Sequence, residues 1–178
     1  RFTYSHTDLL LVQSEAFIAP VTKLAPNIPI EYYPNSVEDD FYSPSERVIP
    51  VIESLQSGFK VLFAGNIGSA QSMKTIVSAA EALKTHADIK IVLLGSGSKL
   101  DWVAQQSFNK GLGNIHIEGK RPVEMMPLLM RQASALLVTL TNQPIFELTI
   151  PSKIQAYLAV GRPIIACLNG EGAKTVND

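Results

Sequence analysis

The chain has 178 residues, of which 46% are hydrophobic and 17% are charged, a composition that predicts a packed core and argues against disorder. Its size suits one domain and a piece of a second, and its net charge of -1 disfavours nucleic-acid binding by bulk charge. The single cysteine, Cys167, excludes an internal disulfide, fits a reducing cytosol and is expected to be inert packing on a buried strand. No stretch reaches the roughly 18 apolar residues that span a bilayer.

The first fifty residues predict short, irregular elements. The apolar run 8–13 predicts a strand, and a helix-like stretch opens at Ser14 and is interrupted or restarted at Pro20. Residues 36–50, with several Pro, Asp and Ser residues, predict a linker with a short helix beginning near Ser45. We therefore place the domain boundary in this linker.

From Lys60 onward, predicted strands and helices alternate. Apolar runs predict five strands, at 60–64, 89–94, 114–118, 135–139 and 163–167. Helical spacing of apolar residues predicts helices at 70–84, 99–109, 122–132, 152–160 and 171–177. Continuous apolar strands separated by helices are typical of a parallel sheet covered on both faces. With right-handed crossovers, the fold class is α/β, a doubly wound, Rossmann-like parallel sheet.

Ligands in such sheets bind beyond the carboxyl ends of the strands. This rule selects five loops, which hold most of the glycines of this half: 65–71, 95–99, 119–122, 140–151 and 168–172. Glycine lets the backbone approach a ligand, and the helix N-termini in these loops suit a phosphate group. The first loop lacks GxGxxG, and no acidic residue closes the second strand, so the sequence argues against a nicotinamide-dependent oxidoreductase. The phosphate-binding motif GxxxxGK[ST] is absent as well.

The segment Pro151-Ser152-Lys153 opens one of the predicted helices. Ser152 is a good N-cap residue, and Pro151 stiffens the approach to it. A cation at Lys153, in the first helical turn, opposes the helix dipole, and an anion bound there would remove the conflict. The alternative is that Lys153 extends into solvent.

Several of these motifs, taken in register, resemble a known family. They are Ala64-Gly-Asn-Ile-Gly68, Gly95-Ser-Gly97, Ile117-Glu-Gly119 and Ile150-Pro-Ser-Lys-Ile154 with Tyr157-Leu-Ala-Val-Gly-Arg-Pro163. They look like the C-terminal, donor-binding half of a GT-B glycosyltransferase of family 4, the retaining group-1 transferases of bacterial polysaccharide assembly. Residues 1–35 then resemble the tail of the N-terminal acceptor domain or the crossing segment, and 36–178 the donor-binding domain with its C-terminal end incomplete.

The resemblance implies a nucleotide-diphosphate sugar donor, with UDP favoured, and no metal or other cofactor. It implies transfer with retention to a glycan or lipid-linked acceptor, which would be reached through the missing N-terminal domain. We expect this fragment to bind donor without turnover. The expected location is the cytoplasm, with peripheral association of the longer protein at the inner face of the membrane as the alternative.

The resemblance also assigns site residues. Backbone N–H groups of Gly68 and Ser69 would face the diphosphate, and Lys153 would be the catalytic cation that stabilises the leaving diphosphate. The full set of predicted donor-binding residues is Gly65, Asn66, Gly68, Ser69, Gly95, Gly97, Lys120, Arg121, Pro151, Ser152 and Lys153.

The chain departs from the family pattern in the first loop and around the last ligand helix. In the first loop, Asn66 stands at the position of the usual Arg, and Gln71 or Ser72 stands near that of the usual Lys. The family usually has two glutamates eight residues apart, and in register they fall on Leu148 and Ala156, with Glu147 one residue off. Two alternatives therefore stay open. One is a non-enzymatic nucleotide-binding domain. The other is a nucleotide-sugar 2-epimerase, which would need catalytic carboxylates and a histidine in the cleft.

Overall fold

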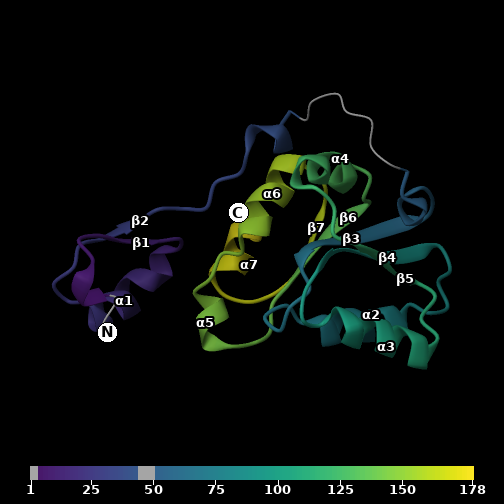
Figure 1. Cartoon of the computed structure of the whole chain (residues 1–178), viewed down its shortest axis with the longest axis horizontal. Coiled ribbons are helices and arrows are strands. Elements are labelled where there is room, and N and C mark those ends of the chain that lie inside the picture. The colour runs from purple at the N-terminus through teal and green to yellow at the C-terminus, as the bar shows by residue number, and fades with distance from the viewer. Residues whose placement is uncertain (1–3, 44–50) are drawn as a thin grey trace.

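The computed structural model describes residues 4–43 and 51–178, which form a small N-terminal unit and a larger sheet unit (Figure 1). The helix that the sequence predicts near Ser45 lies outside the described residues. The segment between the units is not a free linker throughout. Phe41, in the short 3-10 turn Asp39–Phe41, is buried in the core of the sheet unit.

The sheet unit is built on five parallel strands in the order β5-β4-β3-β6-β7. The strands are β3 (Phe59–Asn66), β4 (Ile89–Ser96), β5 (Ile115–Gly119), β6 (Ala135–Thr139) and β7 (Ile164–Cys167). Its helices are α2 (Met73–Ala82), α3 (Leu100–Lys110), α4 (Met126–Arg131), α5 (Pro144–Glu147), α6 (Ser152–Val160) and α7 (Glu171–Asn177). The predicted doubly wound parallel sheet is therefore confirmed.

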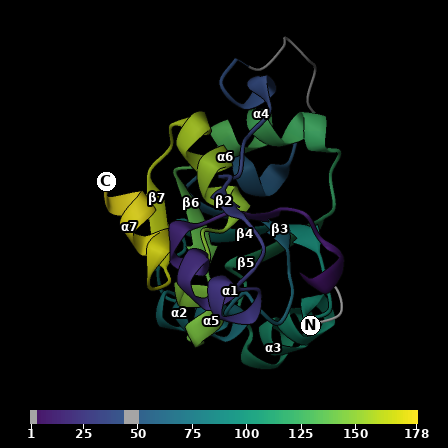
Figure 2. The ribbon, with the colours of Figure 1, turned by 90° about the vertical axis from the view of Figure 1, so that its left-hand side faces the viewer.

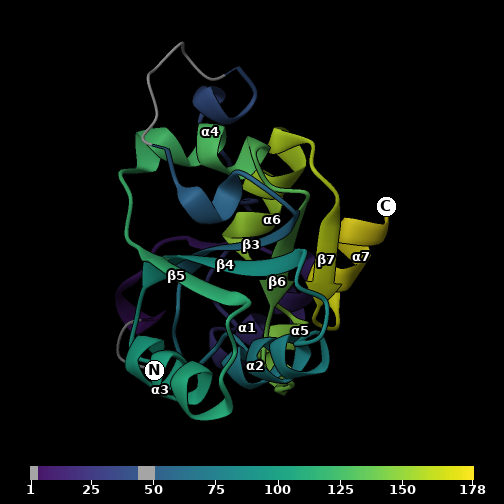
Figure 3. The same cartoon turned by 90° about the vertical axis from the view of Figure 1, so that its right-hand side faces the viewer.

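Each face of the sheet has its own core cluster, because successive side chains of a strand alternate between the faces. Even-numbered residues of the central strands, such as Leu62 and Leu136, pack with helices α4 and α6. Odd-numbered ones, such as Phe63 and Leu137, pack on the face of α2 and α3. Figure 3 shows these two helix pairs on opposite sides of the sheet.

The N-terminal unit is a two-stranded parallel sheet with one helix, formed by β1 (Leu10–Val12), α1 (Ile18–Leu24) and β2 (Ile30–Tyr32). The helix-like stretch begins as the 3-10 turn Glu15–Phe17 and continues as α1, whose first turn contains Pro20, so of the two predicted alternatives the structure agrees with a restart of the helix there. Pro20 is the third residue of α1, where the missing N–H removes no intrahelical bond. Figure 2 shows this unit in front of the sheet unit, on the side to which the carboxyl ends of the strands point.

Three further predictions about the sheet unit are corrected. Cys167 is exposed, because β7 is an edge strand of this sheet and three of its four residues are open to solvent. The loop 140–151 contains the short helix α5, which the sequence analysis treated as loop. The helix predicted at 122–132 begins as a 3-10 turn and becomes α-helical only at Met126.

Candidate functional site

The candidate site lies where the sheet order reverses, between the neighbouring strands β3 and β6. These two strands pair in register only at Val61–Ala135 and Leu62–Leu136. Beyond that point the hydroxyl of Tyr157, from α6, stands between them. It accepts from the Ala64 N–H at 3.0 Å and donates to the Leu137 carbonyl at 3.2 Å. The strands thus open a crevice toward their carboxyl ends, which is where ligands bind in this architecture.

Lys153 reaches this crevice from the first turn of α6. Its ammonium lies 3.8 Å from the centroid of the Phe63 ring, although α6 itself packs on the opposite face of the sheet. Nζ is also about 3.7 Å from the point where a Cβ on Gly65 would stand. The side chain therefore passes from the α6 face to the α2 face, and the alternative of extension into solvent is wrong.

The ammonium of Lys153 is buried without a hydrogen-bond partner among the residues that the structure describes. Burial lowers the pKa of Lys153 from 10.5 to about 8, because an apolar environment disfavours the charged form. Within the described residues, the favourable contact of this charge is with the face of the Phe63 ring. A buried cation in this state would gain from an anion brought next to it.

Ser152, next to this lysine, does not act as the predicted N-cap. Pro151 occupies the N-cap position with extended backbone angles, and Ser152 is the first helical residue, exposed and without a side-chain cap bond. Proline at that position fixes the extended approach, so helix α6 begins one residue earlier than a serine cap would place it. Pro151 and Ser152 thereby stay beside Lys153 at the same end of the helix.

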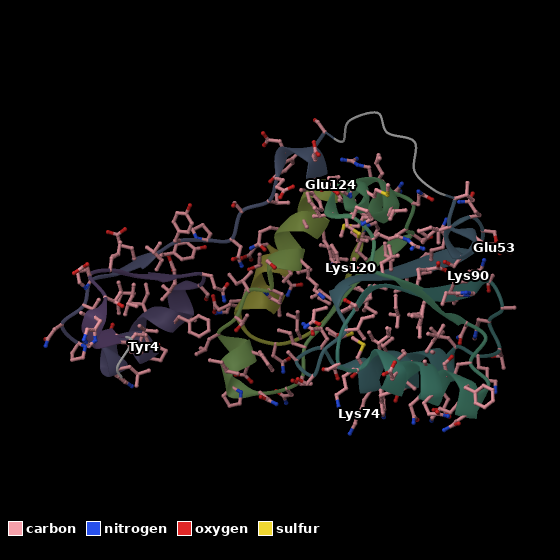
Figure 4. The ribbon with its side chains drawn as sticks, in the orientation of Figure 1. Tyr4, Glu53, Lys74, Lys90, Lys120 and Glu124 are labelled. Atoms are coloured by element: carbon pink, nitrogen blue, oxygen red, sulfur yellow. The ribbon has the colours of Figure 1, made fainter. Side chains whose placement is uncertain are left out.

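Five predicted donor residues line one pocket of about 330 Å³ at the carboxyl ends of β3, β4 and β5, a volume in the range of ligand sites. They are Gly65, Asn66, Gly95, Lys120 and Arg121. Figure 4 shows Lys120 beside these strand ends and Lys90 near the opposite end of the sheet. Arg121 is held by an ion pair with Glu118 at 3.7 Å.

Gly95 and Gly97 are required by the packing of two loops. A Cβ on Gly95 would collide with the carbonyl oxygen of Gly65, and one on Gly97 with that of Ile67. Both glycines have positive φ, of 148° and 157°. The two loops are also joined by hydrogen bonds from Ile67 N to Ser96 O and from Lys99 N to Ile67 O. These glycines thus shape the pocket by letting its two loops touch.

The first loop also offers backbone donors. Within the described ranges, the N–H groups of Gly68 and Ser69 donate no hydrogen bond to another backbone or side-chain group. Ser69 lines a second pocket of about 310 Å³ together with Lys74 and Lys99. Of the eleven predicted residues, five thus line the 330 Å³ pocket and Ser69 lines the second one, with Gly68 just before it. Pro151, Ser152 and Lys153 lie at the start of α6 and line neither of these two pockets, and Gly97 supports the loop after β4.

Sequence reasoning missed the contact between this edge and the N-terminal unit. The Asn35 side chain donates to the Ile150 carbonyl at 3.1 Å, and the Ile150 N–H donates to Gln13 Oε1 at 3.3 Å. Ile150 directly precedes Pro151, so both units hold the start of α6. Uncharged polar residues such as Gln13 and Asn35 carry no distinctive spacing, and no sequence signal pointed to them.

The two positions where the resemblance places glutamates are apolar and half-buried. Ala156 packs against the core cluster on the α6 face, and Leu148 follows α5. Glu147 is exposed and lines a further pocket of about 440 Å³ at the ends of β6 and β7.

Over residues 4–43 and 51–178, His, Cys, Asp and Glu form no group of three that could hold a metal ion. None of the helices described there is long and apolar enough to cross a membrane.

Two bacterial glycosyltransferases match this chain in sequence. WcaI of Escherichia coli K12, named for colanic acid biosynthesis, is 29% identical over 103 residues, which cover 57% of this chain and 24% of that protein. WbjE of Pseudomonas aeruginosa, named as a glycosyltransferase, is 26% identical over 106 residues, covering 60% and 26%. The chain thus matches about a quarter of the length of these relatives.

Solved glycosyltransferases share the fold. WaaG, involved in lipopolysaccharide biosynthesis, has a TM-score of 0.73 at 16% identity, covering 95% of this chain and 46% of that chain. HepE of Anabaena, solved with UDP and glucose, has a TM-score of 0.69 at 16% identity, covering 97% and 47%. The C-terminal domain of LpcC of Francisella tularensis has a TM-score of 0.56 at 16% identity, covering 80% and 85%. The chain thus has the GT-B glycosyltransferase fold.

The sequence profile of one family covers most of the sheet unit. The family is described as glycosyl transferases group 1, and its profile matches residues 58–178. This range contains all five strands of the main sheet and every predicted donor-binding residue. The chain belongs to the glycosyl transferases group 1 family.

Proposed function

We propose that this chain is the donor-binding part of a retaining glycosyltransferase that moves a sugar from a UDP-sugar to a glycan or lipid-linked acceptor. The observation that carries the proposal is the buried ammonium of Lys153 beside the first loop, with no partner in the described part of the chain. A diphosphate supplies the anion that this cation lacks. The free N–H groups of Gly68 and Ser69 lie on the same loop and would hold the same group.

Two kinds of relatives support this ligand class. HepE, which shares the fold, was solved with UDP and glucose. WcaI is named for colanic acid biosynthesis, and WaaG is described as involved in lipopolysaccharide biosynthesis. In our proposal the nucleoside occupies the 330 Å³ pocket beside Lys120 and Arg121, and the diphosphate lies next to Lys153.

The donor-binding part would contribute to catalysis by electrostatic stabilisation. Transfer breaks the bond between the sugar carbon and the diphosphate oxygen, so negative charge develops on the diphosphate as it leaves. A fixed cation and backbone donors aimed at that charge stabilise the transition state more than the ground state. Lys153 would supply the cation and the first loop the N–H groups.

Calorimetric titration of the chain with UDP, GDP, ADP and NAD tests the proposal. We expect UDP to bind, and Lys153→Met to weaken that binding at least tenfold, since a hydrogen bond to a charged group contributes about 1.5–3 kcal/mol. Lys90→Met is the matched control, because Lys90 lies near the amino end of β4 and donates to Ser57. Binding of NAD alone, or equal UDP affinity in both variants, would contradict the proposal.

Nucleotide binding without transfer is the second candidate, and Leu148 and Ala156 favour it. Both stand where the family resemblance places glutamates, and neither can ionise or hold a hydroxyl group. Measuring UDP-sugar turnover by the longer protein separates the two candidates. Transfer of sugar to an acceptor supports the enzyme, and tight UDP binding without turnover supports the binding domain.

A further inference from the structure

A second buried polar group without a hydrogen-bond partner in the described residues belongs to β6, one of the two strands that flank the crevice. Thr139 ends β6 and is 1% exposed, yet its Oγ1 makes no hydrogen bond to any residue within the described ranges. Buried hydroxyl groups without a partner are uncommon in native proteins, because burial removes their bonds to water. Each such group calls for a specific explanation.

The position of Thr139 follows from strand alternation and register. It is an odd-numbered residue of β6, and Leu137, two residues before it, packs on the α2 face. Thr139 therefore faces the side where the ammonium of Lys153 meets Phe63. Thr139 is three residues beyond Leu136, and Gly65 is three residues beyond Leu62, so both lie just past the point where the pairing of β6 with β3 ends.

Gly65 and Thr139 thus flank the crevice, with the Tyr157 hydroxyl deeper between the strands. Gly65 lines the proposed nucleoside pocket, and the Lys153 ammonium lies directly behind it. A glycine here leaves no side chain between the pocket and the buried cation. The ammonium can only donate and the hydroxyl can donate as well, so an anionic oxygen placed between them would accept from both groups and neutralise the buried charge.

We propose that Thr139 is a second ligand of the donor's diphosphate, and that its hydroxyl and the Lys153 ammonium hold one phosphoryl oxygen between β3 and β6. The proposal rests on the proposed function, since it assigns a further residue to the same donor. Both atoms are closed to solvent in the described structure, so the phosphoryl oxygen reaches them only when the first loop or the Lys153 side chain shifts.

Two substitutions at Thr139 separate a binding role from a structural one. Thr139→Val keeps the shape and removes the hydroxyl, whereas Thr139→Ser keeps the hydroxyl and removes a methyl group. Because the hydroxyl has no partner in the described structure, Thr139→Val should melt at the same temperature as the wild type or higher. Thr139→Ser should melt at a lower temperature, because it leaves a small cavity.

Calorimetric titration of the three chains with UDP gives the decisive comparison. We expect Thr139→Val to bind UDP about tenfold more weakly than the wild type, and Thr139→Ser to bind within threefold of it. Thr139→Val would then lose UDP affinity without losing stability, whereas Thr139→Ser would lose stability and keep its UDP affinity. Equal UDP affinity in all three chains overturns this inference and leaves the proposed function intact. No UDP binding by the wild type overturns both.

Discussion

The two units of the molecule use apolar residues differently. In the sheet unit, two clusters of buried side chains cover both faces of five strands. In the N-terminal unit, two strands of three residues and one helix leave large apolar side chains open, with Leu11 at 55% and Tyr33 at 65% exposure. Apolar composition alone therefore does not make a core. A second packed layer is needed to bury it.

The largest expected effect tests this difference directly. Leu136→Ala, in the centre of the sheet unit, should lower the free energy of unfolding by about 2–5 kcal/mol, since Leu136 has no exposed surface. Leu11→Ala, in the N-terminal unit, should change it by about 0.5 kcal/mol or less. Urea denaturation followed by circular dichroism measures both. If the two variants lost similar amounts of unfolding free energy, the N-terminal unit would be as well packed as the sheet unit, contrary to our interpretation.

Within the sheet unit, the buried charge of Lys153 destabilises the folded state, and the size of this destabilisation depends on pH. Its pKa is about 8 in the folded chain against an ordinary value of 10.5. Between these pH values the unfolded chain binds more protons, so the stability of the folded state rises with pH across this window. The rise is at most about 3 kcal/mol, and the destabilisation is fully present below pH 8.

The measurement is urea denaturation of the wild type and Lys153→Met at pH 7, 9 and 10.5. We expect the variant to be the more stable protein at pH 7 and the difference to shrink toward pH 10.5. Groups that titrate in both chains cancel in this difference. A constant difference across the series would show that the lysine is not a buried cation in solution.

The next effect concerns the hydroxyl that separates β3 from β6. Burial and bonds to the backbone fix this group, and burial raises the pKa of Tyr157 above its ordinary value. Tyr157→Phe leaves the Ala64 N–H and the Leu137 carbonyl without that partner and should cost about 1–3 kcal/mol of stability. Leu158→Ala, at an exposed position of the same helix, is the control. If Tyr157→Phe lowered the free energy of unfolding no more than Leu158→Ala does, the hydrogen bonds of the hydroxyl would add nothing to stability.

The strands could be predicted from sequence because each is a continuous apolar run, such as 89–94, that only a sheet buried on both faces accommodates. The loops at their carboxyl ends followed from the topology, which is why Gly65 and Lys120 could be assigned to one site. The crevice could not be predicted. It depends on Tyr157 standing between two strands and on Lys153 passing from one face to the other, and neither feature leaves a periodic signal.

The smallest effect concerns the junction of the two units. Asn35 donates to the Ile150 carbonyl at 3.1 Å and to Gln13 Oε1 at 3.5 Å, and Gln13 in turn accepts from the Ile150 N–H. Asn35→Ala should cost about 1 kcal/mol or less, because these groups are only partly buried and water replaces the bonds. We expect the loosening of the backbone around Ile150 to be easier to detect than this small change in the free energy of unfolding.

Amide hydrogen exchange at Ile150 measures that local effect. In Asn35→Ala we expect faster exchange of the Ile150 N–H, since its acceptor Gln13 loses the neighbour that orients it. Asn27→Ala, an exposed asparagine of the same unit, should leave that rate unchanged. Unchanged exchange in both variants would mean that the N-terminal unit does not hold the loop before Lys153. The start of α6 would then be positioned by the sheet unit alone.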